Sequence, residues 1–253
     1  MFRPRIIPAL LLRNLGLVKS VGFKNYKYIG DPINAVKIFN DLKADELVFL
    51  DILASREKRA ISLDFVLKVG DEANMPFSVG GGIRTIQDIK SVLRAGAEKV
   101  VINTYAVEDP SFIRTAAEEF GSSTITVCID VKKKFLGNQQ VYIYGGSKST
   151  GLDPVSFAKS MEEMGAGELI INSIEKDGMM EGYDIELIKA ISDSVTIPVV
   201  ALGGAGKISD LNDAVIYGHA SAVAAGSLFV FHGPRRAVLI NYPQSEELKN
   251  IFK

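Results

Sequence analysis

Short apolar runs rich in β-branched residues alternate with amphipathic stretches along the whole chain. In the stretch 31–43, for instance, Ile33, Val36 and Phe39 can share one face of a helix. This alternation predicts parallel strands joined by crossover helices. Eight runs are expected to form strands: Ile6–Leu12, Leu47–Ile52, Phe77–Gly80, Val100–Asn103, Thr124–Val131, Leu169–Ser173, Val199–Leu202 and Ala222–Gly226. The sequence therefore predicts an α/β fold, a single (β/α)8 TIM barrel that spans residues 1–253.

One stretch interrupts this rhythm. Residues 132–144 hold two runs of alternating polar and apolar residues around Gly137 and Asn138, which is typical of a hairpin on the surface.

The two halves of the chain also resemble each other. The segment 45–50 (DELVFL) is similar to 167–172 (GELIIN), and 80–84 (GGGIR) is similar to 203–207 (GGAGK). The offset of about 122 residues is half the chain, which favours two half-barrels related by a pseudo-two-fold axis. The alternative is the weak similarity that any two βα units share.

Composition narrows the classes of function. The hydrophobic share of 47% can fill one large core, and a net charge of −1 argues against binding to nucleic acid or an anionic membrane. The single Cys128 shares the inward parity of Asp130 and fits a core position in a cytoplasmic protein. With only His219 and His232, we expect neither a metal site nor a Ser-His-Asp triad, and no cofactor is implied. Chemistry is left to carboxylates, lysines and amides.

Glycine turns follow the predicted strands at symmetric positions in the two halves. Glycine allows backbone amides to approach an anion, and a helix start adds a favourable dipole. Two such sets favour a small ligand that carries a phosphate at each end, although tight turns alone would also require glycine. The candidate phosphate-binding residues are Gly81, Gly82, Asn103 and Thr104 in the first half, and Asp177, Gly178, Gly203, Gly204, Ala225, Gly226 and Ser227 in the second.

Side-chain alternation places charged residues on the barrel floor. If Leu11, Asn103 and Asn172 line the pocket, residues two, four or six positions earlier on the same strands also face inward. The inward positions at the strand starts are then Arg5, Lys99 and Glu168, and Glu46 shares a face with Val48 and Leu50 on its own strand. Two cations and two anions can neutralise one another in a partly buried ring. The alternative is that these strand starts are solvated.

Eight segments between Arg5 and Phe231 carry a family resemblance. RIIPALLL, DELVFLDI, VGGGIRT, INT, CIDV, GGSKSTGLD, DGMMEGYD and GGAG resemble, in order, those of the cyclase subunit of imidazole glycerol phosphate synthase. The resemblance implies two phosphate sites at the C-terminal face and a glutaminase at the N-terminal face of the barrel. It also implies that ammonia passes along the axis through a charged gate, here Arg5, Glu46, Lys99 and Glu168. Glu98 falls at a position that faces the glutaminase in that family.

In this family, ammonia joins a bis-phosphorylated ribulosyl aminoimidazole substrate, with ring closure and cleavage. The resemblance assigns acid/base roles to two aspartates, of which the second is Asp130 and the first falls on Leu11. The family's loop lysine is present as Lys19, whereas Asn172 and Leu202 replace a threonine and a serine. The candidate catalytic residues are therefore Asp130, Lys19 and Asn172.

Leucine cannot transfer a proton, and losing one acid/base group costs about 10²- to 10⁴-fold in rate. We therefore expect impaired cyclase chemistry, unless Asp51 or Asp177 fills the gap.

The intact floor and the altered rim together resemble one subgroup of these barrels, the WbuZ-type glycosyl amidation proteins encoded with surface-polysaccharide genes. That resemblance implies a glutaminase and a sugar amidotransferase as partners, which together convert a sugar N-acetyl group to an acetamidine. An apolar rim at Leu11 and Leu202 suits the passage of neutral ammonia. Two alternatives stay open: an imidazole glycerol phosphate cyclase with a rearranged active site, and a non-catalytic scaffold that activates a glutaminase.

Overall fold

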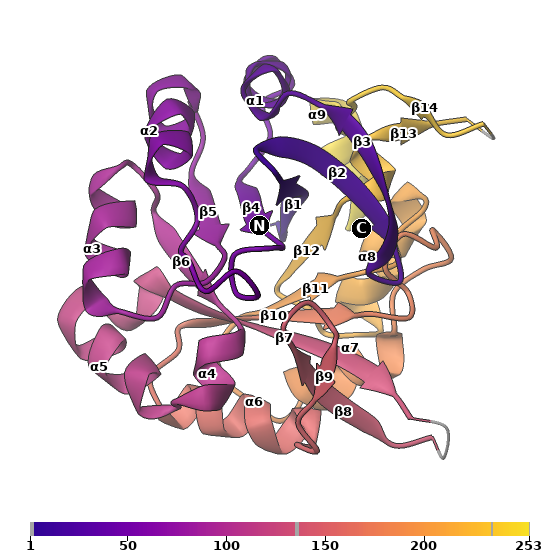
Figure 1. The fold of residues 1–253 in the computed structure, drawn as a ribbon. Helices are drawn as coiled ribbons and strands as arrows, with labels where there is room; N and C mark the ends of the chain where they lie inside the picture. Colours follow the sequence, from indigo (N-terminus) through magenta and orange to yellow (C-terminus); the bar gives the residue numbers. More distant parts are fainter. Residues whose placement is uncertain (1–2, 135–136, 234, 253) are drawn as a thin grey trace.

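Eight parallel strands close into a barrel in the computed structural model, which describes residues 3–134, 137–233 and 235–252 (Figure 1). Strand β12 pairs with β1, and β10 with β7, so the sheet has no open edge in the barrel wall. The barrel strands are β1 Arg5–Arg13, β4 Leu47–Asp51, β5 Phe77–Gly80, β6 Lys99–Ile102, β7 Ile125–Lys133, β10 Glu168–Ser173, β11 Val199–Leu202 and β12 Ala222–Ala225. The predicted TIM barrel is confirmed, and the strand boundaries differ from the predicted ones by at most two residues.

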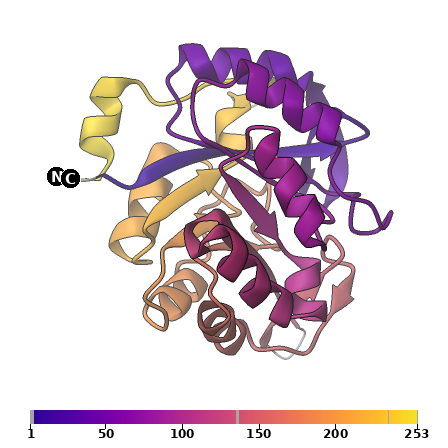
Figure 2. The same ribbon diagram turned by 90° about the vertical axis from the view of Figure 1, so that its left-hand side faces the viewer.

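Helices surround the barrel on its outside (Figures 1 and 2). Their bounds are α1 Pro32–Asp41, α2 Leu63–Glu72, α3 Ile86–Arg94, α4 Thr104–Glu108, α5 Ser111–Phe120, α6 Pro154–Glu163, α7 Ile185–Ser192, α8 Ile208–Ile216 and α9 Ser245–Ile251. Helices α1 and α6 begin alike, since the carboxylates of Asp31 and Asp153 accept hydrogen bonds from Asn34 N and Ser156 N, each followed by proline at the first helical position.

The half-barrel repeat extends to the bounds of the elements. Helix α6 starts 122 residues after α1 (154 − 32), α8 starts 122 residues after α3 (208 − 86), and β11 starts 122 residues after β5 (199 − 77). The offset found between similar segments of the sequence is therefore also the offset between corresponding strands and helices.

Two separate cores follow from the alternation along the strands. One set of side chains, which includes Phe39, Phe49 and Phe229, packs between the barrel and its helices. The other set fills the barrel axis and consists of Ile7, Ala9, Val48, Val101, Cys128, Ile170, Val200, Leu202, Ala222 and Ala224. The predicted parity of β1, β4, β6 and β10 is confirmed, because the members of the axial set on these strands all have the predicted inward parity.

The loops after the barrel strands carry additional strands. The predicted hairpin after β7 is present, since β8 Gln139–Ile143 pairs antiparallel to β7 and continues into β9 Lys148–Ser149. A hairpin of β2 Gly16–Val21 and β3 Lys24–Gly30, and the short pair β13 Phe231–His232 and β14 Ala237–Val238, were not expected.

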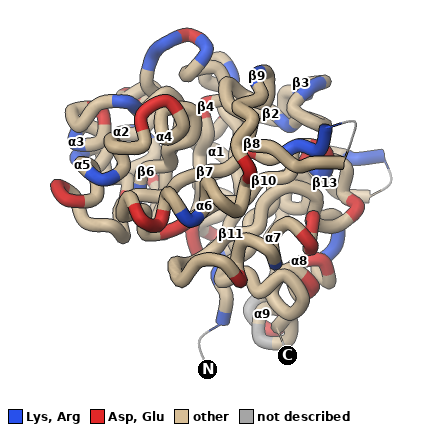
Figure 3. Tube along the Cα trace, turned by 90° about the horizontal axis from the view of Figure 1, so that it is seen from below, with Lys and Arg blue, Asp and Glu red and all other residues tan. Residues whose placement is uncertain are grey.

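Both chain termini lie at the same end of the barrel, where β1 begins (Figure 2). Acidic and basic positions are interspersed over the molecule, as its net charge near zero leads one to expect (Figure 3). Among the described residues, no helix has the length and apolarity needed to cross a membrane.

Candidate functional site

A cavity of about 390 Å³ opens at the C-terminal ends of the strands, and each strand of the barrel contributes to its lining. It brings together every candidate catalytic and phosphate-binding residue. These are Lys19, Gly81, Gly82, Asn103, Thr104, Asp130, Asn172, Asp177, Gly178, Gly203, Gly204, Ala225, Gly226 and Ser227. This mouth lies at the end of the barrel opposite the strand starts, so the cavity and the charged floor are separated by the axial core.

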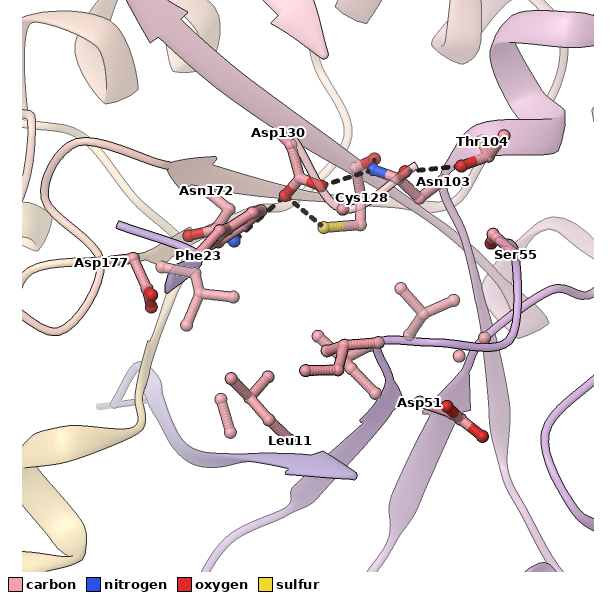
Figure 4. Close-up of a pocket in the computed structure, with 18 of the residues that line it drawn as sticks. Leu11, Phe23, Asp51, Ser55, Asn103, Thr104, Cys128, Asp130, Asn172 and Asp177 are labelled. Carbon is pink, nitrogen blue, oxygen red and sulfur yellow. Dashed lines mark hydrogen bonds between the residues drawn. The ribbon is translucent and has the colours of Figure 1, made fainter. Parts of the chain in front are cut away.

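Asp130 sits in the cavity wall under three donors (Figure 4). Asn172 Nδ2 donates to its Oδ1 at 3.1 Å, Asn103 Nδ2 donates to its Oδ2 at 3.2 Å, and Cys128 Sγ lies 3.9 Å from Oδ1. Burial raises the pKa of Asp130 from 3.8 to about 7, against the opposing effect of the Asn172 amide. This carboxyl can therefore take up and release a proton near neutral pH.

Lys19 reaches the cavity from strand β2. Its Nζ is buried and donates to Ala9 O at 2.5 Å, and burial lowers the pKa of Lys19 to about 8 despite the nearby Asp177 carboxylate. Burial likewise raises the pKa of Asp177. The hydrogen bond that Ser20 Oγ donates to Asp177 Oδ2 at 2.6 Å opposes this rise in part. Strands β1, β2 and the loop after β10 thus place a lysine and a carboxyl close to the second set of glycines.

Leu11 lines the cavity where the family pattern has its first aspartate. Asp51 also lines it, but its Oδ2 accepts from Arg59 Nη1 at 2.6 Å and its Oδ1 accepts from Leu53 N and Ala54 N. Figure 4 shows the Asp51 carboxylate directed away from Asp130 across the cavity. Of the two carboxyls that could replace the missing one, only Asp177 is left without a cation hydrogen-bonded to it.

The glycine turns have a steric cause of their own. A Cβ at Gly82 (φ +63°) would lie 1.8 Å from Arg59 O, and one at Gly204 (φ +123°) would lie 2.2 Å from Gly182 O. No other residue fits these close backbone approaches. Glycine at these positions is therefore explained by packing, and its presence does not by itself indicate a phosphate site.

The helices behind these turns start in the same way in both halves. Asp88 accepts from Arg84 N and Thr85 N at 3.2 and 3.0 Å, and Asp210 accepts from Gly206 N and Lys207 N at 3.1 Å or less. These amides are already bonded to carboxylates. These helix-start amides are therefore occupied within the protein.

The four charged residues predicted for the floor do form one cluster. The Arg5 guanidinium donates to both Glu46 and Glu168, while Lys99 Nζ lies 3.0 Å from Glu168 and 3.8 Å from Glu46. Both carboxylates are buried, and Ser78 Oγ donates to Glu46 at 3.2 Å. Burial raises the pKa of Glu46, with Lys99 and Arg5 opposing it. Two cations and two anions therefore close the strand starts, and we call this cluster the floor ring.

Comparison with known proteins agrees with this architecture. The family model described as histidine biosynthesis protein matches residues 5–234. An imidazole glycerol phosphate synthase subunit HisF of Alkaliphilus metalliredigens is 46% identical over 232 residues, 92% of each chain. The chain belongs to the HisF-like cyclase-subunit family of imidazole glycerol phosphate synthase.

Two other members of the HisF family are similar over their whole length. A protein of Pseudomonas aeruginosa, provisionally named as a subunit of the same synthase, is 47% identical over 248 residues, 98% of this chain and 99% of its own. A provisionally named HisF of Leptospira interrogans is 44% identical over 253 residues, which is the full length of both chains.

Several residues of this HisF-like site escaped the sequence analysis. Phe23 and Tyr26 come from the β2–β3 hairpin and line the cavity, as do Tyr105 of α4 and Tyr144 in the turn between β8 and β9. For Phe23 and Tyr26, the signal in the sequence was the presence of aromatic residues within an otherwise polar stretch. Among the described residues, no cluster of three or more histidine, cysteine or acidic side chains could hold a metal ion.

Proposed function

We propose that this HisF-like subunit accepts ammonia from a glutaminase at the N-terminal face of the barrel and delivers it at the C-terminal face. The delivery would serve amidation of a sugar in surface-polysaccharide biosynthesis, in the cytoplasm, with a sugar amidotransferase as the second partner. The observation that carries the proposal is the sequence of environments along the axis: a charged floor ring, an apolar interior, and a cavity whose wall holds the buried Asp130 carboxyl.

The apolar interior favours neutral ammonia over ammonium. Side chains such as Ala9, Val48 and Ala224 fill the axis between the two ends, and a buried ion would lose its hydration there without a partner. The floor ring lies at the strand starts, at one end of this interior. A neutral nitrogen ligand is therefore the species that suits this path.

The mouth of the barrel supports delivery better than cyclisation. Leu11 and Leu202 are apolar where the family pattern has an aspartate and a serine, and Asp51 is already paired with Arg59. Asp130 remains as one proton carrier whose pKa lies near 7. A phosphorylated ligand between the two glycine sets would then act as substrate or as regulator of the transfer.

The test is obstruction of the axis. Val48 is buried in the axial core, so Val48→Trp should abolish glutamine-dependent amidation in the system reconstituted with glutaminase and amidotransferase. Amidation driven by ammonium salts should be retained, because ammonium reaches the acceptor from solution. A bulky side chain outside the axis, as in Leu67→Trp on an exposed position of α2, is the matched control.

Two measurements keep the result interpretable. Thermal unfolding and co-purification with the glutaminase show whether Val48→Trp still folds and docks. If a folded, docked Val48→Trp barrel supports full glutamine-dependent amidation, the conduit proposal is wrong and a scaffold that only activates the glutaminase is favoured.

A cyclase with a rearranged site is the second candidate. It is favoured by one observation, the buried Lys19 and Asp177 beside the second glycine set, which could supply the missing acid/base group. The distinguishing measurement is steady-state turnover of the bis-phosphate substrate with ammonium salts and no partner. Robust turnover supports the cyclase and contradicts the view that cyclase chemistry is impaired.

A further inference from the structure

Polar side chains line one wall of the barrel axis, along the contact between β7 and β10. In the register of these two strands, Thr126 lies opposite Glu168, Cys128 opposite Ile170, and Asp130 opposite Asn172. We call Thr126, Cys128, Asp130 and Asn172 the polar seam. Between the floor ring and the cavity, the inward side chains of the other walls are apolar: Ile7, Ala9, Val48, Leu50, Val101, Val200, Leu202, Ala222 and Ala224.

Two atoms of the polar seam are buried without a hydrogen-bond partner. Thr126 is fully buried, and its Oγ1 has none. Asn172 is 6% exposed, and its Nδ2 donates to Asp130 whereas its Oδ1 has no partner. Buried polar atoms are nearly always paired, because leaving one unpaired costs stability. Valine would fill the position of Thr126 without that cost, so the hydroxyl itself calls for an explanation.

The two unpaired atoms mark the two ends of the seam. Thr126 is the register partner of Glu168 and therefore lies at the level of the floor ring. Asn172 lines the cavity. Four residues along a strand span about 13 Å, and Cys128 lies between, with its thiol directed toward Asp130. A hydroxyl, a thiol and a carboxyl–amide pair thus follow one another from floor to mouth.

We propose that the polar seam binds ammonia during its passage, an inference that rests on the proposed function. Ammonia offers three N–H donors and one lone pair. The Thr126 hydroxyl can donate to that lone pair beside the floor ring, and Asn172 Oδ1 can accept an N–H where the path opens into the cavity. The apolar walls keep the nitrogen neutral, and the seam gives it hydrogen bonds that those walls lack.

The experiment compares Thr126→Val, which keeps the shape and removes the hydroxyl, with Thr126→Ser, which keeps the hydroxyl. In the complex with glutaminase and amidotransferase, Thr126→Val should form several-fold less amidated product per glutamine hydrolysed, while Thr126→Ser stays near the wild type. Amidation driven by ammonium salts should be equal in all three. The Tm of Thr126→Val should rise by about 2 °C or more, since a buried unpaired hydroxyl is removed.

A crystal structure in an ammonium salt gives a readout that needs no partner. We expect density for a single atom within hydrogen-bond distance of Thr126 Oγ1 in the wild type, lost in Thr126→Val. If the wild type shows this density but Thr126→Val forms as much amidated product per glutamine hydrolysed as the wild type, the atom is a structural water and the proposal is wrong. An empty site in the wild type also overturns the proposal.

The failure of the seam differs from the failure of the conduit. If Val48→Trp blocks transfer while Thr126→Val and Thr126→Ser form equal amounts of amidated product per glutamine hydrolysed, only the proposal for the polar seam is wrong. If Val48→Trp leaves transfer intact, the conduit itself is wrong.

Discussion

At the scale of single residues, burial favours the uncharged forms of Asp130 and Lys19, an acid and a base. The pKa of Asp130 rises to about 7 and that of Lys19 falls to about 8, in both cases because burial disfavours the charged form. Both groups therefore titrate close to neutral pH. At Leu11 the same cavity presents only hydrocarbon, so this position cannot transfer a proton.

The stability of the protein should depend on the protonation of Asp130. Between its unfolded pKa near 3.8 and its folded pKa of about 7, the folded protein binds this proton and the unfolded chain does not. The contribution to stability is thus full below about pH 4 and is lost as pH rises through about 7. We expect Asp130→Asn to gain stability relative to the wild type between pH 5 and pH 8, by up to a few kcal/mol. Urea denaturation at the two pH values measures this, and an equal difference at both would contradict it.

At the scale of elements, loops from separate strands hold one another over the cavity. The Arg56 guanidinium, from the loop after β4, donates to Tyr144 O at 2.8 Å and Gly145 O at 3.0 Å in the turn between β8 and β9. Tyr144 N in turn donates to Thr104 Oγ1 at 3.1 Å, beside the first glycine set. On the other side, Gly22 N in the β2–β3 turn donates to Asp177 O at 2.9 Å.

Removing the Arg56 contact should loosen the β8–β9 turn without unfolding the barrel. Arg56→Ala deletes two exposed hydrogen bonds, so the free energy of unfolding should change by no more than about 0.5 kcal/mol. Hydrogen exchange of the amides around Tyr144 should accelerate, because the turn loses its attachment to the loop after β4. Arg114→Ala, at an exposed position of α5, serves as the control and should leave this exchange unchanged. Unaltered protection in Arg56→Ala would show that the turn is held from elsewhere.

At the scale of the whole molecule, the floor ring and the cavity lie at opposite ends of one axial core. The ring joins β1, β4, β6 and β10 at their starts, so its charges connect strands that are distant in sequence. Glu46 and Glu168 are buried and depend on Arg5 and Lys99 for neutralisation. Removing one cation of the ring should therefore be costly, because it leaves a buried carboxylate without its partner.

Arg5→Ala should destabilise the barrel more than loss of a peripheral ion pair. It leaves two buried carboxylates with one cation, and because Arg5 is 27% exposed we expect a cost of about 2 kcal/mol rather than the larger cost of a fully buried pair. Arg3→Ala is the matched control, since Arg3 bonds Asp45 outside the ring and is 36% exposed; its loss should cost about 1 kcal/mol or less. Urea denaturation of both variants measures the loss in free energy of unfolding. Equal losses would mean that the charges of the floor ring are as well solvated as a surface ion pair.

The sequence by itself determined the strands, their inward faces and the charged residues of the floor. These depend on local rules: alternation with a period of two assigns Arg5, Glu168 and Asn172 to one side of their strands whatever else the chain does. Likewise, the glycine turns could be located because Gly82 and Gly204 follow predicted strands and adopt φ of +63° and +123°, a local backbone conformation that favours glycine.

Only the tertiary structure decided which of these groups are free to act. Three features follow from contacts between separate segments of the chain. Arg59 forms an ion pair with Asp51, and two side-chain amides donate to Asp130 while burial raises its pKa. Strand β2 places Lys19 in the cavity. The polar seam is of the same kind, because Thr126 meets Glu168 only through the register in which β7 and β10 pair. The side of a strand on which a residue lies follows from the sequence of that strand alone. The hydrogen-bond partners and the burial of a side chain, and therefore its pKa, are determined only when the strands come together in the closed barrel.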